Sequence, residues 1–359
     1  MRAALALARR GLGQVAPNPA VGCIIVASDG RVVGRGWTQQ GGRPHAETEA
    51  LARAGAATRG GTAYVSLEPC AHEGKTPPCA SALIEAGVVR VVAAVRDPDP
   101  RVAGRGIAAL RDAGIDVVEG LLEDEAAELN AGFFLRVNEG RPLVTLKLAT
   151  SLDGKIATAN GDSQWITGEA SRARVHLMRA EHDAILIGAG TALADDPALT
   201  CRLPGMEARS PTRILVDAAR RVPHSAQLFR TARATPTIYA TRAGDMATLQ
   251  PLEKLGVEIL SLPADGPGHV DLAALLQALG ARGFTRVMVE GGGGVGAALL
   301  LLGLVDRLAW FRAPLLIGGE GIPAIADLAL DRLADAPGFE RTGVETIGTD
   351  LLETYRRRA

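Results

Sequence analysis

Three potential metal ligands that lie far apart in the chain, His45, Cys70 and Cys79, constrain its fold more than any other feature. An imidazole and two thiolates are a common zinc ligand set, and three protein ligands leave the fourth tetrahedral position for water, as in catalytic zinc sites. Glu47 lies two residues beyond His45 and opens an apolar helical stretch over residues 47–54. We therefore expect a fold that brings both cysteines to the start of this helix, with the carboxylate beside the metal.

The same residues favour a site for hydrolytic deamination. Zinc nucleobase deaminases carry H-x-E followed by P-C-x-x-C, and their glutamate transfers protons for a water that zinc activates. Here eight residues separate Cys70 from Cys79, and most of this insert reads as a polar loop. The ligands can still converge if Cys70 follows a strand over residues 63–67 and Cys79 begins a helix over 79–86. His72, inside the insert, remains an alternative ligand.

Length, composition and charge are those of a two-domain globular protein that binds small ligands. A chain of 359 residues exceeds what one hydrophobic core usually serves, and 47% hydrophobic with 22% charged residues is ordinary for globular domains. The net charge of −1 gives no electrostatic basis for binding nucleic acid. No basic cluster precedes the terminal arginines at 356–358, which we expect to form a solvated tail.

The cysteine content and the apolar runs indicate neither secretion nor membrane insertion. Two of the four cysteines are assigned to zinc, and Cys23 and Cys201 are expected to be small packing residues. Residues 1–10 contain too short an apolar run for a signal peptide and are predicted to form an amphipathic helix. Later apolar runs fall far below the ~20 residues of a membrane span, so we expect a cytoplasmic protein without a membrane partner.

The first part of the chain begins with a hairpin and then alternates helix-like and strand-like segments. Strands are predicted at residues 21–26, 31–36, 63–67, 88–95 and 115–118, and helices at 46–54, 79–86, 107–113 and 123–130. Such alternation is typical of an α/β domain, a sheet covered by helices. The turn-prone residues 138–142 mark the expected boundary, so the predicted domains are residues 1–141 and 142–359.

The second part repeats the alternation and is predicted to form another α/β domain. Its strands are predicted at residues 143–149, 184–187, 213–216, 237–240, 257–260 and 286–289. Its helices are predicted at residues 169–179, 246–255, 272–281 and 295–302.

A glycine-rich segment follows the strand predicted at 286–289, and Gly291, Gly293 and Gly296 match G-x-G-x-x-G. Glycines permit close backbone approach, and the N-terminus of the helix that follows attracts phosphate. Too little chain follows for a complete dinucleotide-binding unit, so we interpret the segment as a pyrophosphate cradle, with a flexible turn as the alternative. Arg179 and Arg202 are candidate clamps for a substrate phosphate, although isolated arginines are usually surface residues.

Motifs in both halves resemble those of one known family. In the first half they are Asn-Pro-Ala-Val-Gly at 18–22, His-Ala-Glu at 45–47, Glu-Pro-Cys at 68–70 and Thr-Pro-Pro-Cys at 76–79. In the second half they are Ser-Leu-Asp-Gly at 151–154, Ser-Gln-Trp-Ile-Thr at 163–167, Leu-Ala-Asp-Asp-Pro at 193–197 and Val-Glu-Gly-Gly at 289–292. They span nearly the whole chain and resemble the bifunctional deaminase/reductase family of riboflavin biosynthesis. Because that family has the same eight-residue insert between its cysteines, the departure from general deaminase spacing supports the resemblance.

The resemblance implies two consecutive reactions. An N-terminal domain with a cytidine-deaminase-like fold would hydrolyse an amino group of 2,5-diamino-6-(5-phosphoribosylamino)pyrimidin-4(3H)-one. A C-terminal domain similar to dihydrofolate reductase would then use NADPH to reduce the ribosyl group to a ribityl chain. The implied partner is this small phosphoribosylaminopyrimidine, and the implied assembly is a homo-oligomer.

The resemblance also implies roles for individual residues. It places zinc on His45, Cys70 and Cys79, makes Glu47 the proton donor and sets Asn18 against the pyrimidine. The implied NADPH contacts are Ala149, Trp165, Thr191, Asp195, Gly292, Gly293, Gly294, Val295, Gly296, Ala297 and Ala298. The implied substrate contacts in the reductase are Ser163, Arg179, Leu199, Arg202 and Glu290.

Two points of the reductase remain open. Ala218 stands where the family has a serine that contacts the cofactor, so only its backbone can serve. Lys147 and Asp195 are both candidates for handling the proton of the reduction.

Two other functions compete with this interpretation. A deaminase of another base, such as adenosine in tRNA, fused to an unrelated oxidoreductase would carry P-C-x-x-C and a basic groove, and neither is evident. A nucleotide-binding regulatory protein with structural zinc would place a fourth ligand on the metal, whereas the sequence offers Glu47 beside an open position.

Overall fold

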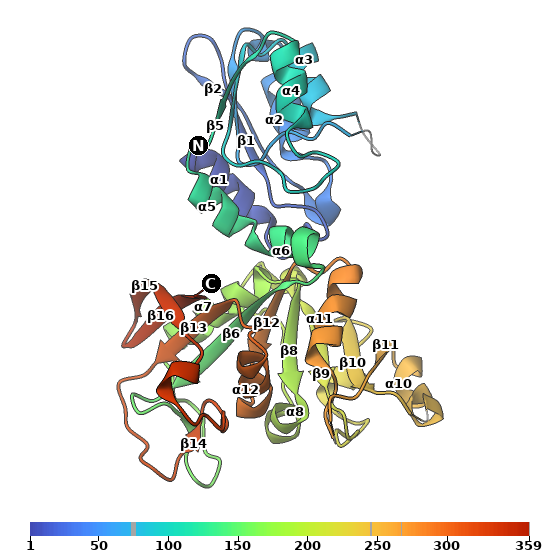
Figure 1. Ribbon diagram of the computed structural model, residues 1–359, viewed down its shortest axis with the longest axis vertical. Coiled ribbons are helices and arrows are strands. Elements are labelled where there is room, and N and C mark those ends of the chain that lie inside the picture. The colour runs from blue at the N-terminus through green and yellow to red at the C-terminus, as the bar shows by residue number, and fades with distance from the viewer. Residues whose placement is uncertain (73–76, 245, 267, 359) are drawn as a thin grey trace. The chain divides into compact units, whose positions relative to one another are not determined.

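The computed structural model describes residues 1–72, 77–244, 246–266 and 268–358, and it divides into two compact units, Met1–Arg141 and Pro142–Ala359 (Figure 1). Within the described residues, each unit is built on one large β-sheet with helices on both faces. The insert between the two cysteines lies partly outside this description, because residues 73–76 are not among the described ones.

The sheet of the first unit has the order β2-β1-β3-β4-β5. The strands are β1 (Gly22–Val26), β2 (Val32–Trp37), β3 (Thr62–Val65), β4 (Arg90–Ala93) and β5 (Asp116–Glu119). The predicted hairpin is confirmed, since β1 pairs antiparallel with β2; β3, β4 and β5 then run parallel to one another.

Helices cover this sheet at very close range where the strands carry glycine. On one face α2 (Ala46–Ala54), α3 (Cys79–Glu85) and α4 (Arg105–Asp112) enclose the main core. A Cβ atom at Gly36 would lie 2.1 Å from the Ala46 carbonyl oxygen, so only glycine allows the backbone at the start of α2 to approach β2 this closely. On the other face α1 (Arg2–Ala8) and α5 (Glu123–Leu129) form smaller apolar clusters, and α6 (Ala131–Glu139) ends the unit.

The sheet of the second unit has the order β11-β10-β9-β8-β12-β6-β13-β16-β15 among the described strands. Its parallel strands are β6 (Leu143–Thr150), β8 (Ala184–Gly188), β9 (Thr212–Val216), β10 (Thr237–Arg242), β11 (Val257–Leu262), β12 (Arg286–Glu290) and β13 (Arg307–Arg312). The antiparallel hairpin of β15 (Phe339–Ile347) and β16 (Asp350–Arg357) closes one edge. A separate small sheet joins β7 (Lys155–Ala157) to β14 (Ile322–Pro323).

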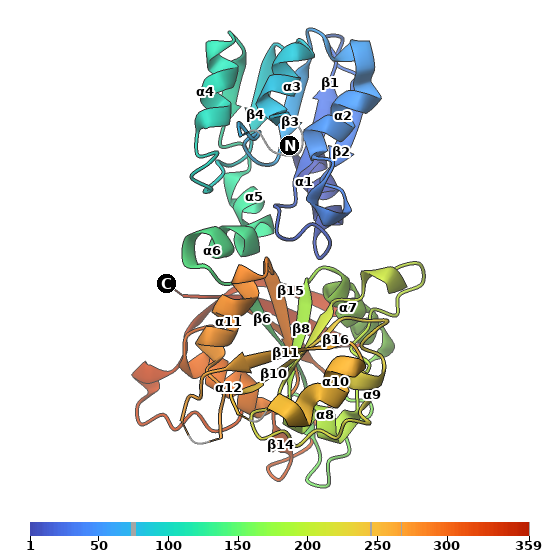
Figure 2. The same cartoon turned by 90° about the vertical axis from the view of Figure 1, so that its right-hand side faces the viewer.

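Two apolar layers sandwich this second sheet (Figure 2). One contains α11 (Leu272–Ala281) and α12 (Gly293–Leu301), and the other contains α8 (Ala189–Asp195), α9 (Gln227–Arg230) and α10 (Gln250–Lys254). The helix α7 (Glu169–Ala180) crosses from the loop after β7 to the start of β8. Because β12 returns between β8 and β6, the chain order reverses there, and such a switch point opens a crevice at the carboxyl ends of the strands.

Most predicted elements are present within two or three residues of their expected bounds, and several expectations were wrong. The helix expected at 295–302 is present two residues earlier, from Gly293, whereas the one expected at 246–255 divides into a 3-10 turn and the short α10. The arginines at 356–358 are not a free tail, since Arg356 and Arg357 belong to β16. Among the described elements, we did not predict α6, α8, α9, β7, β13, β14 or the β15–β16 hairpin.

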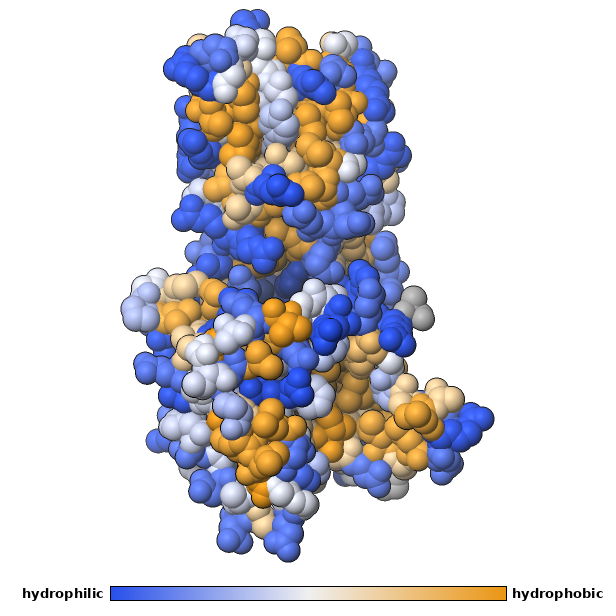
Figure 3. Space-filling model, turned by 90° about the vertical axis from the view of Figure 1, so that its left-hand side faces the viewer, coloured by the Kyte–Doolittle hydropathy of each residue, from blue (hydrophilic) through white to orange (hydrophobic). Residues whose placement is uncertain are grey.

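In the part of the chain that the structure describes, no helix combines the length and apolar character needed to cross a membrane. The face shown in Figure 3 has apolar patches interspersed with hydrophilic side chains. Cys23 and Cys201 are buried and unpaired, in agreement with the packing role expected for them.

Candidate functional site

The three expected ligands converge in the first unit. His45 is the N-cap residue of α2, Cys79 is the first residue of α3, and Cys70 lies in the loop after β3. The Nδ1 atom of His45 is 3.3 Å from Cys79 Sγ and 3.7 Å from Cys70 Sγ, and all three ligand atoms lie within 4.8 Å of one another. One tetrahedral zinc ion fits among them with a position left for water.

The electrostatics of this cluster suit a metal that prefers thiolates. A hydrogen bond from the Cys79 side chain, with His45 nearby, lowers the pKa of Cys70 to about 4. The same hydrogen bond, together with burial, raises the pKa of Cys79, so one thiol ionises readily and the second would do so on binding a cation.

Glu47 lies in the first turn of α2 and is only 3% exposed. Burial and the neighbouring Cys70 thiolate raise the pKa of Glu47 to about 7. A carboxyl group with a pKa near neutrality can both accept and return a proton, which is the requirement for a general acid–base.

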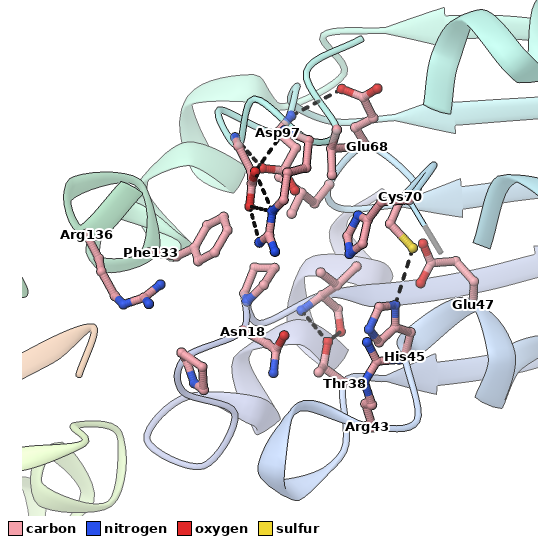
Figure 4. Close-up of a pocket in the computed structure, with 18 residues that line it drawn as sticks. Asn18, Thr38, Arg43, His45, Glu47, Glu68, Cys70, Asp97, Phe133 and Arg136 are labelled. Atoms are coloured by element: carbon pink, nitrogen blue, oxygen red, sulfur yellow. Dashed lines mark hydrogen bonds and ion pairs between the residues drawn. The ribbon is translucent and has the colours of Figure 1, made fainter. Parts of the chain in front are cut away.

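These residues open onto a cavity of about 320 Å³. In Figure 4, Glu47, Cys70 and His45 occupy one side of it, and Phe133 and Arg136 of α6 lie on the opposite side. Asn18, the expected pyrimidine contact, also lines the cavity. A Cβ atom at Gly42 would lie 1.8 Å from Asn18 Nδ2, so the backbone at Gly42 holds this amide in place.

Glu68 fixes the loop that carries Cys70. Its buried carboxylate accepts hydrogen bonds from the backbone N–H groups of Gly104, Gly106 and Ile107, at the start of α4. A carboxylate at a helix N-terminus is favourable, because it satisfies free N–H groups and complements the helix dipole. The ligand loop is therefore tied to a second helix on the same face of the sheet.

Several cavity residues were not predicted as site residues from the sequence. They are Thr38, Arg43, Asp97, Asp99, Arg101, Phe133 and Arg136. Burial raises the pKa of Asp97 to about 6, and Arg101 holds the pKa of Asp99 below its usual value. These residues come from loops and from α6, where no sequence period marks a pocket wall.

His72, the alternative ligand, lines this cavity but is not part of the three-ligand group. Its Nδ1 atom is buried and has no hydrogen-bond partner among the described residues.

In the second unit, the expected reductase residues gather at the carboxyl edge of the parallel strands. Ala149 is near the end of β6, Glu290 ends β12, and Thr191 lies in α8 directly after β8. These three strands flank the switch point of the sheet, where ligands of open α/β folds bind.

A buried charge cluster occupies this edge. Arg179, near the end of α7, donates from Nε and Nη2 to the two carboxylate oxygens of Glu290 at 2.7 and 2.8 Å. Burial opposes ionisation of Glu290, but Arg179 and Lys147 hold its pKa below the usual value. Lys147 of β6 pairs in register with Glu290 of β12, and burial lowers the pKa of Lys147.

The glycine-rich segment forms the tight turn between β12 and α12 that we expected. Gly291 and Gly292 have φ angles of 72° and 79°, which favour glycine. Built Cβ atoms at either residue would lie about 3.0 Å from the Thr191 side chain, so α8 and this turn are in contact. The first N–H groups of α12 follow at Gly293, where they can bind phosphate.

The remaining expected residues differ in what they can offer a ligand. Trp165 is 66% exposed and stacks on the guanidinium of Arg172. The side chain of Arg202 is exposed to solvent. Burial raises the pKa of the Asp195 carboxyl group above its usual value. The Leu199 side chain is buried in the core, so a ligand contact there would use its backbone.

Comparison with known proteins gives matches over both units. A family described as "RibD C-terminal domain" matches residues 142–352, and one described as "Cytidine and deoxycytidylate deaminase zinc-binding region" matches residues 1–95. The curated riboflavin biosynthesis protein RibD of Escherichia coli is 44% identical over 98% of this chain and 96% of its own length. The RibD protein of Bacillus amyloliquefaciens is 42% identical over 98% of this chain and 94% of its own length.

Solved structures also match over the whole chain. Acinetobacter baumannii RibD superposes with a TM-score of 0.89 at 38% identity, covering 100% of this chain and 98% of the other. A Thermotoga maritima protein described as a diaminohydroxyphosphoribosylaminopyrimidine deaminase/5-amino-6-(5-phosphoribosylamino)uracil reductase gives 0.88 at 37% identity, covering 100% and 97%.

Proposed function

The chain belongs to the RibD family of bifunctional riboflavin-biosynthesis enzymes, a zinc-dependent deaminase joined to an NADPH-dependent reductase, and from this premise we propose which substrate and which residues each half uses. The first unit deaminates 2,5-diamino-6-(5-phosphoribosylamino)pyrimidin-4(3H)-one, and the second reduces the ribosyl group of the product to a ribityl chain. The observation that carries the proposal is the convergence of His45, Cys70, Cys79 and the buried Glu47 on one cavity.

In the deaminase, His45, Cys70 and Cys79 hold zinc, which when bound polarises water for attack on the pyrimidine. Asn18 orients the ring. The Glu47 carboxylate takes the proton from the attacking water, passes it to the ring nitrogen beside C2, and then helps to protonate the amine that leaves as ammonia. Burial of Glu47 keeps its pKa near neutrality, so both directions of transfer are accessible.

In the reductase, NADPH supplies the hydride when bound, and the protein supplies orientation. The backbone of Gly292 to Ala298 and the start of α12 hold the pyrophosphate, while Ala149, Trp165, Thr191 and Asp195 contact the rest of the cofactor. Ser163, Arg179, Leu199, Arg202 and Glu290 hold the substrate. Lys147 and Asp195 are the two candidate proton carriers, and Lys147 is the one beside the Arg179–Glu290 pair.

The proposal also covers the cellular location, the oligomeric state and the binding partners of the enzyme. We assign it to the cytoplasm, to a homo-oligomer, and to a small-molecule substrate with neither nucleic acid nor membrane as partner. The net charge of −1 supports the absence of nucleic acid, and light scattering of the purified protein tests the oligomer.

The test is an assay of the complete chain with the diaminopyrimidine phosphate, in which ammonia release and NADPH absorbance are followed together. Glu47→Gln should retain zinc and lose deamination by about 10²-fold to 10⁴-fold. Glu49→Gln is the matched control, because Glu49 is on the same helix in an ion pair with Arg53. Unchanged ammonia release in the zinc-loaded Glu47→Gln protein would refute the role of Glu47, and ammonia without NADPH consumption would refute the role of the second unit.

A further inference from the structure

Asp350 is a buried carboxylate at the tip of the C-terminal hairpin. It is 1% exposed and begins β16, directly after the turn formed by Gly348 and Thr349. Its Oδ2 atom accepts hydrogen bonds from the Gly168 backbone N–H at 2.8 Å and from the Ser171 hydroxyl at 2.5 Å. These partners lie about half the chain away, so the hairpin tip is tied to the start of α7.

The carboxylate lies at the start of α7, which has no side-chain cap of its own. The N-cap residue of this helix is Gly168, which has no side chain to accept from the first N–H groups. Asp350 does not make that bond, but from another element it accepts from the N–H of Gly168 itself, one of the four N–H groups without a partner inside the helix, and its negative charge complements the positive end of the helix.

The segment held in this way contains residues proposed to contact ligands. Ser163 and Trp165 lie five and three residues before Gly168. Arg172, one turn into α7, stacks on the Trp165 ring at 4.7 Å and donates to the Thr167 carbonyl oxygen at 2.7 Å. Asp350 and Arg172 therefore hold the C-terminal part of a short loop whose tryptophan is largely exposed.

The far end of α7 is fixed as well. Arg179 pairs with Glu290 and donates from Nη1 to the Thr200 carbonyl oxygen at 3.0 Å. The helix thus spans from the Trp165 loop to the buried charge cluster, and Asp350 contacts its first turn.

We propose that Asp350 is a positioning residue of the reductase, which pre-orders the loop of residues 163–167 for NADPH through Gly168 and Ser171. This inference rests on the proposed cofactor role of Trp165. A loop that is already ordered binds its ligand without the entropy cost of ordering, so the carboxylate acts on cofactor affinity and not on the hydride transfer itself.

The test compares NADPH kinetics of Asp350→Ala, Asp350→Asn and the unmodified enzyme, with the deaminated pyrimidine as substrate. Asp350→Ala should raise the KM for NADPH by about fivefold to tenfold with kcat changed less than about twofold. Asp350→Asn should stay within about twofold, because its amide oxygen still accepts from Gly168. Asp335→Ala, in an exposed ion pair with Arg332, is the control, and ammonia release serves as the internal control.

Hydrogen exchange provides a readout of the loop itself. Amides of residues 163–168 should exchange faster in Asp350→Ala than in the unmodified enzyme, and saturating NADPH should reduce the difference. A lower melting temperature with an unchanged KM, or equal losses of kcat and kcat/KM, would overturn the inference. If Asp350→Ala does not fold, Ser171→Ala decides, since a raised KM supports the inference and an unchanged KM refutes it. Absence of NADPH oxidation by the unmodified enzyme would instead refute the proposed function.

Discussion

The Arg179–Glu290 pair gives a stability prediction that can be worked out from its geometry. Two short hydrogen bonds, 2.7 and 2.8 Å, join side chains that are only 12% and 10% exposed. In Glu290→Gln the amide keeps one acceptor oxygen for Arg179 but loses the charge. Arg179 and the neighbouring Lys147 then remain buried without a compensating carboxylate.

Removing one partner of a buried ion pair lowers the free energy of unfolding by about 3–5 kcal/mol, and because Gln keeps one acceptor, Glu290→Gln should cost somewhat less, about 2–3 kcal/mol. For a unit of this size, the loss corresponds to a fall in melting temperature of about 5–10 °C. The pKa of Lys147 should fall as well, because Glu290 is the charge that favours its protonated form.

Calorimetry of the complete chain measures the effect as a shift of the transition that NADPH stabilises. The matched control is Glu258→Gln, which removes the carboxylate from an exposed pair with Arg282, where the side chains are 52% and 36% exposed. Glu258→Gln should lower the free energy of unfolding by less than about 1 kcal/mol. Equal shifts for the two variants would show that burial of the Arg179–Glu290 pair does not determine its contribution.

Three further predictions concern pH, packing and metal. Burial lowers the pKa of His182 from 6.5 to about 4, so the unfolded chain binds a proton that the folded chain excludes. The free energy of unfolding should therefore fall by up to about 3 kcal/mol as the pH is lowered from 6.5 to 4. Denaturant titrations of His182→Gln should show a weaker dependence of this free energy on pH. A Cβ atom at Gly106 would lie 1.9 Å from the Pro69 carbonyl oxygen, so Gly106→Ala should displace the Cys70 loop and lower zinc content, whereas Gly319→Ala, in open space, should not. Chelation should abolish ammonia release while leaving NADPH oxidation with the deaminated substrate intact, and parallel loss of both would contradict two separate sites.

The sequence predicts the fold well where apolar periodicity is local. The helix expected at 272–281 has the observed bounds, because four buried leucines repeat along one face and Asp271 caps its start. The start of α12 lies two residues before its expected position. Gly293 and Gly294 have poor helix propensity, yet both belong to α12, where the Ala326 backbone N–H donates to the Gly293 carbonyl oxygen at 3.2 Å and leaves no room for a side chain at Gly293.

The C-terminal hairpin is the part of the fold that local patterns could not reveal. Most side chains of β15 are exposed, so its sequence shows neither a buried run nor a clean alternation. The strand is held by pairing with β16, which pairs in turn with β13. Asp350, at the tip of this hairpin, therefore had no sequence signal that linked it to Gly168.

The two candidate sites differ in predictability because they use different chemical groups. Zinc requires imidazole and thiolate side chains, so His45, Cys70 and Cys79 are recognisable by residue type and spacing. The proposed cofactor site depends instead on backbone N–H groups at the start of α12 and on small residues such as Ala149 and Val295, which are common in any core. Residue type alone carries little information at such positions, whereas Gly291 and Gly292, with φ angles that other residues rarely adopt, are recognisable in the sequence. A backbone-built site is therefore visible mainly through its topology, at the reversal of strand order between β8 and β6.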